Sequence, residues 1–204
     1  MSYLERNQQT LAEIGQNLRL RRGSVIGRSP NTTFTSIGNY KSTILEKDLY
    51  IGLKENRHKE GDFLRGWVAR ELVLINMIEQ RFPQLLPEFP VFHGILEHPT
   101  GETLGVLTED FSYGGRYPVK GFPRSLFVDI PDKDVPKELE EIAGKEIDNY
   151  DLATMCFLVN GQRRIGDFGE MYSGMITTEL SERYPIDDLM ATIVKYTLRI
   201  DYPL

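Results

Sequence analysis

YDLATMCFLVNGQRRIGDFG, residues 150–169, is the stretch of this sequence that determines the expected fold. Two short apolar runs in it flank Asn160-Gly161, and both of these residues tolerate the positive φ angles of a two-residue hairpin turn. The stretch therefore predicts a small β-hairpin with Asp151 and Asp167 at its open end. Two carboxylates brought together beside glycines favour a metal and a phosphate chain over a packed core.

The pattern D-L-x-x-x-x-F-L-V-N-G-x-x-x-I-G-D-F-G resembles the catalytic loop, the following hairpin and the D-F-G motif of the protein kinase superfamily. The spacing between the two aspartates also fits that family. The resemblance implies that Asp167 binds a Mg²⁺ ion that bridges the phosphates of ATP, and that Asp151 accepts or orients the proton of the acceptor hydroxyl.

Upstream, residues 24–54 are rich in β-branched and aromatic residues and are expected to form antiparallel strands. Turn-forming residues, among them Gly38-Asn39, separate the strands. The four runs expected as strands are 24–26, 32–37, 41–45 and 49–53.

Two residues of this sheet acquire roles from the kinase resemblance. A turn at residues 36–40 would cover the phosphates, so that Gly38 contacts the nucleotide, and Lys54 in LYIGLK would hold the α- and β-phosphates. The turn at Gly27 is the competing candidate for the nucleotide loop, and Lys41 is the competing candidate for the phosphate lysine.

Residues 61–82 show the periodicity of an amphipathic helix. Glu71 falls in the middle of its apolar arc, where a carboxylate is costly unless it is paired. The resemblance implies that its partner is Lys54. The residues that share the apolar arc are Leu64, Trp67, Val68, Ile75, Ile78 and Phe82.

The segments FPVFHGILE and LGVLTEDF predict two further strands before a linker at residues 112–115. The resemblance makes Thr108 the gatekeeper of the nucleotide site. It also makes residues 109–111 the hinge, where the backbone of Glu109 and Phe111 binds adenine.

The expected fold is α+β: a minimal protein-kinase-like bilobal fold with an antiparallel β N-lobe, one long helix and a truncated helical C-lobe. Residues 1–22 are expected to form a polar leader or a short helix, residues 23–111 the N-lobe, and residues 112–204 the reduced C-lobe. Asp187-Asp188 would cap a final helix that presents Leu189, Ile193, Tyr196 and Ile200 on one face.

Composition excludes several classes of protein. The net charge of −6 argues against a nucleic-acid surface or a polybasic membrane anchor. No apolar run approaches the ~20 residues of a membrane-spanning helix, and the single cysteine, Cys156, suggests a reducing compartment. His58, His93 and His98 lack metal-ligand spacing and are expected at the surface or at strand ends. We expect a monomer.

Three positions depart from the kinase pattern. Asn149-Tyr150 replaces the usual histidine and arginine, Ala153 replaces a lysine, and Cys156 replaces the asparagine that binds a second metal ion. Either a second metal ligand comes from elsewhere, or one Mg²⁺ ion suffices, or the protein is catalytically dead.

A kinase-like chain with so small a C-lobe resembles the minimal kinases among bacterial type III secreted effectors, in particular the Hop-family kinase that phosphorylates the host ninety-kilodalton heat-shock chaperone. The resemblance implies a serine/threonine kinase that uses ATP and Mg²⁺ in the host cytosol and has a protein substrate. The alternatives are a small-molecule phosphotransferase, a pseudokinase that acts as a binding module, and an α+β domain unrelated to kinases.

Overall fold

The structure is a computed structural model, and it describes most of the chain. The described residues are 1–17, 24–28, 32–56, 61–111, 128–131, 134–143, 152–153, 155–159, 161–166, 168 and 193–201. The helices and strands, with η marking a 3₁₀ helix, are α1 (Tyr3–Asn17), β1 (Ser24–Arg28), β2 (Thr32–Ser42), β3 (Lys47–Asn56), α2 (Gly61–Arg81), η1 (Pro83–Glu88), β4 (His93–Glu97), β5 (Thr103–Glu109), β6 (Val128–Asp129), α3 (Lys137–Ala143), β7 (Cys156–Val159), β8 (Gln162–Ile165), η6 (Ile193–Tyr196) and β9 (Thr197–Arg199).

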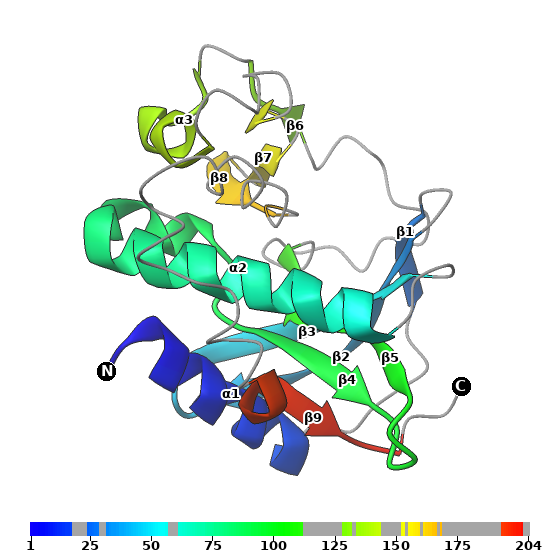
Figure 1. Cartoon of the computed structure of the whole chain (residues 1–204). Coiled ribbons are helices and arrows are strands. Elements are labelled where there is room, and N and C mark those ends of the chain that lie inside the picture. Colours follow the sequence, from blue (N-terminus) through cyan, green and yellow to red (C-terminus); the bar gives the residue numbers. More distant parts are fainter. Residues whose placement is uncertain are drawn as a thin grey trace.

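Two sheets form the framework of this α+β fold. The larger has six strands in the order β1-β2-β3-β5-β4-β9, and all its pairs are antiparallel except β4 with β9. The smaller sheet has the order β6-β7-β8, and α2 lies between the two sheets (Figure 1). None of the helices in the described part of the chain is long and apolar enough to cross a bilayer.

Helices α1 and α2 cover opposite faces of β4. A Cβ atom on Gly94 would meet the side chain of Leu11 from α1 at 2.7 Å, whereas the neighbouring His93 contacts Glu71 from α2. Successive residues of a strand point to opposite faces of the sheet. Both faces of β4 are therefore covered, which explains why all five of its residues are buried.

The predicted helix over residues 61–82 is confirmed as α2, which ends at Arg81. Pro83 begins η1, since proline has no N–H with which to continue an α-helix. Four residues of the predicted arc, Leu64, Val68, Ile75 and Ile78, are buried.

The predicted turn at residues 36–40 is wrong. Strand β2 runs through this segment, and Gly38 pairs with Ile51 of β3 beside a bulge in the register. The chain reverses later, at residues 43–46. Glycine is also the residue expected at a bulge, so the same signal was compatible with an uninterrupted strand. Gly38 therefore lies within a strand and not in a loop over a nucleotide.

The hairpin predicted around Asn160-Gly161 is confirmed by the pairing of β7 with β8. Cys156 lies opposite Ile165, and Gly161 has a φ of 76°, which glycine adopts without strain. Asn160 lies outside the described residues. The hairpin is attached to η1 because the guanidinium of Arg163 binds the carboxylate of Glu88 through two hydrogen bonds of 2.5 and 2.7 Å.

The final helix expected after Asp187-Asp188 is wrong over residues 193–200, and its first part, including Leu189, lies outside the described residues. Ile193–Tyr196 form the 3₁₀ helix η6, and Thr197–Arg199 form β9, which pairs in parallel with β4. Ile193 and Tyr196 are buried, so an i, i+3 spacing of apolar residues is satisfied here by a single 3₁₀ turn.

In its C-terminal half, α1 is attached to the larger sheet through Glu13. The buried carboxylate accepts hydrogen bonds from the hydroxyls of Ser42, Thr43 and Tyr40 and from the backbone N–H of Thr43. Burial alone would raise the pKa of Glu13, but these hydrogen bonds outweigh it and lower the pKa to about 2.

We expect Glu13→Ala to reduce the free energy of unfolding by about 2–4 kcal/mol, because several donors lose their acceptor in a buried site. Since the carboxylate pKa is lower in the folded than in the unfolded state, its contribution is present above about pH 4.5 and is lost as the pH falls towards 2. Urea unfolding at several pH values measures both effects. Glu5→Ala on the exposed side of α1 is the control, and equal losses in the two variants would contradict the prediction.

Candidate functional site

The side chain of Glu71 projects from the middle of α2 into the protein interior, where only 3% of the residue is exposed. The indole N–H of Trp67, one turn earlier, donates a hydrogen bond of 3.0 Å to Oε1. Nδ1 of His93 from β4 lies 3.1 Å from Oε2. The carboxylate thus has the close polar neighbours that its burial requires.

Lys54 lies on the same side of the sheet as this carboxylate. Its Nζ atom is 5.2 Å from the centroid of the Trp67 ring, a cation–π contact. The competing candidate Lys41 is exposed on β2 and pairs in register with Asp48. Of the two lysines, only Lys54 therefore lies beside Trp67, the residue that binds Glu71. We call Glu71, Trp67, His93 and Lys54 the Glu71 cluster.

His93 is the first residue of β4, in line with the expectation of a surface or strand-end position, but its side chain is buried. Burial lowers its pKa, and the positive charge of Lys54 lowers it further, to about 3. The imidazole is therefore neutral at physiological pH. Both hydrogen-bonding groups of its backbone are bound by the Asn7 amide, which accepts from the N–H and donates to the carbonyl at 2.9 Å each.

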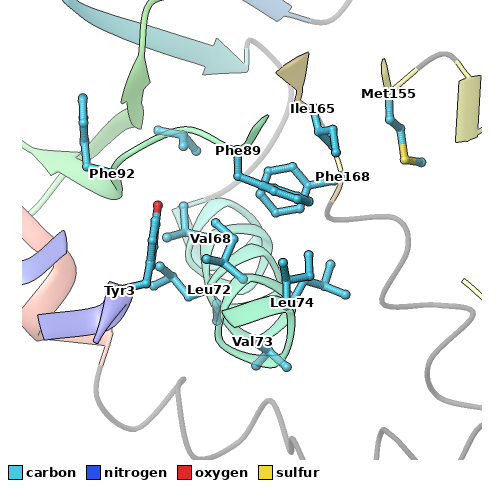
Figure 2. Packing of buried hydrophobic residues seen from close by; sticks show 14 of the residues in the cluster. Tyr3, Val68, Leu72, Val73, Leu74, Phe89, Phe92, Met155, Ile165 and Phe168 are labelled. Atoms are coloured by element: carbon cyan, nitrogen blue, oxygen red, sulfur yellow. The ribbon is translucent and has the colours of Figure 1, made fainter. Parts of the chain in front are cut away.

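The ring of Phe168 reaches the same cluster from the end of the hairpin. It is fully buried and meets Phe89 edge-on at 4.9 Å and His93 at 5.5 Å between ring centroids. Figure 2 shows Phe168 and Phe89 together above α2. Two residues earlier, the N–H of Gly166 donates to the carbonyl of Met155 at 2.9 Å. Gly166 and Phe168 are thus each in contact with another segment of the chain.

The two aspartates of the predicted catalytic pair, Asp151 and Asp167, lie outside the described residues. Within the described part of the chain there is no group of three or more His, Cys, Asp or Glu side chains that could hold a metal ion. Ala153 and Cys156, which occupy the positions of a kinase lysine and a second metal ligand, are both buried.

Thr108 and Glu109 are the last two residues of β5, and Phe111 lies two residues beyond its end. Thr108 is half-buried and lies between Gly52 of β3 and His93 of β4 in the strand register. The carboxylate of Glu109 accepts from the Lys47 ammonium and from a backbone N–H, both at 3.0 Å. Both oxygens of the Glu109 carboxylate are therefore already bound to other groups of the protein.

A pocket of about 270 Å³ lies beside Glu109 and Phe111, between the end of the larger sheet and the β7–β8 hairpin. The Arg164 guanidinium lies 5.2 Å from the Phe111 ring and donates a hydrogen bond to the carbonyl of Pro87. The Glu71 cluster does not line this pocket. Its lining residues are Lys47, Asp48, Tyr50, Glu109, Asp110, Phe111, Val159, Gln162 and Arg164.

The sequence points to Lys54 and Glu71, both of which the structure places in the Glu71 cluster, but it does not point to His93. The available signal was its position in the apolar run VFHGIL, where every neighbour is predicted to be buried. The helical period places Trp67 on the apolar arc and gives no sign of the hydrogen bond from its indole N–H to Glu71.

The chain was compared with protein-family models and with curated protein sequences, and neither comparison found a match.

We expect the imidazole of His93 to remain neutral from about pH 8 to about pH 5. An unfolded histidine takes up a proton near pH 6.5, so this site should reduce the free energy of unfolding by about 1.4 kcal/mol per pH unit below that value. NMR titration of the ring protons, assigned with His93→Gln, measures the first effect, and urea unfolding of the two proteins measures the second. A ring titration midpoint between about pH 6 and 7 would contradict the prediction.

Burial raises the pKa of the Cys156 thiol to about 12. We therefore expect a thiol reagent at neutral pH to leave the folded protein unmodified and to label the single cysteine once denaturant unfolds the chain. The rate of labelling against urea concentration measures this. Rapid labelling without denaturant would show that the β7–β8 hairpin is more open than described.

Proposed function

We propose that this protein is an ATP- and Mg²⁺-dependent serine/threonine protein kinase with a minimal bilobal fold. The six-stranded sheet with α1 and α2 corresponds to the N-lobe, and the smaller sheet with α3 corresponds to a reduced C-lobe. The proposal joins the kinase-like pattern of residues 151–169 to the arrangement of the described residues.

The main support is that three distant parts of the chain come together around Trp67 and His93. Lys54 comes from β3, Glu71 from α2, and Phe168 from the segment that carries Asp167. The packing of an apolar core does not by itself require Lys54 and Glu71 to lie in one cluster. Their convergence is what a site for phosphoryl transfer requires, since such a site works mainly by positioning groups and stabilising charge.

Each residue has a defined role in this proposal. The Lys54 ammonium, half-buried beside the Trp67 ring, suits the anionic oxygens of a nucleotide phosphate chain. The negative charge of the buried Glu71 carboxylate favours the position of the Lys54 ammonium on the same face of the sheet. Asp151 orients the acceptor hydroxyl and takes its proton. Asp167 is the residue to hold Mg²⁺, which supplies charge neutralisation on the phosphates when it is bound.

The acceptor belongs to the same proposal. On the resemblance to secreted effector kinases, we propose a protein hydroxyl as acceptor, with the host ninety-kilodalton heat-shock chaperone as the first substrate to test. The place of action would then be the host cytosol.

One observation favours a second function, a nucleotide- or protein-binding module without transfer activity. Cys156 is completely buried and its thiol is protonated at neutral pH, so it supplies no ligand to a second metal ion. Ala153 leaves the site without the cation that kinases have at that position.

Incubation with Mg²⁺ and γ-labelled ATP, with and without the eukaryotic chaperone, tests the kinase proposal. We expect label on the chaperone, reduced by about 10²-fold or more in Asp151→Asn, Asp167→Asn and Lys54→Met, because each removes a group that acts on the reacting phosphate or hydroxyl.

Lys41→Met provides the matched control for Lys54→Met, since it removes the same charge from an exposed position of the neighbouring strand. It should retain full transfer activity. Label on the kinase itself but on no other protein would keep the kinase function and reject the chaperone as substrate. Nucleotide binding without transfer to any protein would contradict the kinase proposal and favour the binding module.

A further inference from the structure

A row of small side chains crosses the larger sheet next to Lys54. Ser36 pairs with Gly52, Gly52 with Thr108, and Thr108 with His93. Residues directly opposite in antiparallel strands point to the same face, so this row lies on the face that carries His93 and the Glu71 cluster. We call the part formed by Ser36, Gly52 and Thr108 the glycine recess, because the middle strand contributes no side chain there.

The ring of Phe34 fills this recess. Phe34 pairs directly with Lys54, one row further along the same face, and its ring folds over Gly52. A Cβ atom at position 52 would meet Cζ and Cε2 of the ring, the latter at 2.6 Å. No residue larger than glycine fits under the ring as it stands.

The face around the recess is otherwise only partly covered. Phe34, Ser36, Tyr50 and Lys54 are half-buried, whereas the opposite face of the same strand contributes the fully buried Leu49, Ile51 and Leu53. An aromatic ring that is half-buried in a recess can leave it at a moderate cost in apolar contact.

We propose that Phe34 is a gate for the nucleotide base. This inference rests on the proposed function: with the phosphates held at Lys54, the adjacent recess on the same face is the place for a flat, largely apolar base. In the structure the Phe34 ring occupies that place. Binding of a nucleoside triphosphate requires the ring to move out, whereas binding of a phosphate chain without a base does not.

The Phe34 gate therefore weakens the binding of a ligand that has a base and does not weaken the binding of a phosphate chain alone. The Lys54 ammonium contacts the Trp67 ring, whereas the Phe34 ring lies over Gly52. Removing the ring should strengthen the binding of ATP and leave the binding of inorganic tripolyphosphate unchanged. A residue that acted only on general stability would affect both ligands alike.

The test is calorimetric titration of the full chain with Mg²⁺–ATP and with Mg²⁺–tripolyphosphate, in wild type, Phe34→Ala and Phe34→Leu. We expect both variants to bind ATP about tenfold more tightly than wild type, the factor that corresponds to releasing part of a buried phenyl ring. Leucine keeps an apolar side chain on β2 but lacks the Cζ and Cε atoms that cover Gly52, so it guards against a folding defect of the alanine variant.

Phe82→Leu is the matched control, because Phe82 is another half-buried phenylalanine and directly follows Arg81, the last residue of α2. It should bind ATP as the wild type does. ATP binding by wild type that is unchanged or weakened in both Phe34 variants would overturn the gate and leave the kinase proposal standing. Equal strengthening of ATP and tripolyphosphate would also overturn it. Absence of ATP binding in all four proteins would overturn the proposed function and this inference together.

Discussion

Glu71 places a carboxylate in the middle of the buried, apolar face of α2, where burial without partners would cost several kcal/mol. The surrounding structure meets this requirement from three elements. Trp67 donates from the preceding helical turn, His93 lies against the second oxygen from β4, and Lys54 on β3 contributes positive charge nearby. The position of α2 over the sheet is therefore set by polar contacts as well as by its apolar arc.

His93 connects this cluster to the rest of the molecule. Its ring contacts Glu71 on one side and Phe168 on another, while its backbone is held by Asn7 from α1. A neutral imidazole suits this position because it packs against an aromatic ring at less desolvation cost than a charged one. The N-terminal helix, the central helix and the hairpin segment thus meet at one residue.

The sequence predicted those parts of the structure that depend on local signals. Helix α2 follows from its 3.6-residue period, and the β7–β8 hairpin follows from Asn160-Gly161. The same kind of signal failed at Gly38, because glycine serves bulges and turns alike and the pairing partner in β3 decides between them. Strand β9 could not be foreseen, since its pairing with β4 is a contact between segments a hundred residues apart. Lys54 and Glu71 were identified from pattern and periodicity, but His93 and Phe34 owe their places to tertiary packing.

The edge of β4 that does not pair with β5 is covered by an earlier and by a later segment of the chain. Asn7 binds the backbone of His93 with its side-chain amide, and β9 pairs with Ile95, Leu96 and Glu97. During synthesis, β4 is therefore made long before the strand that covers it. Until residues 197–199 emerge, the growing chain carries an open, apolar strand edge that can pair with another molecule. Such long-range closure raises the contact order and slows folding, so the last described strand acts as protection against aggregation as well as a part of the sheet.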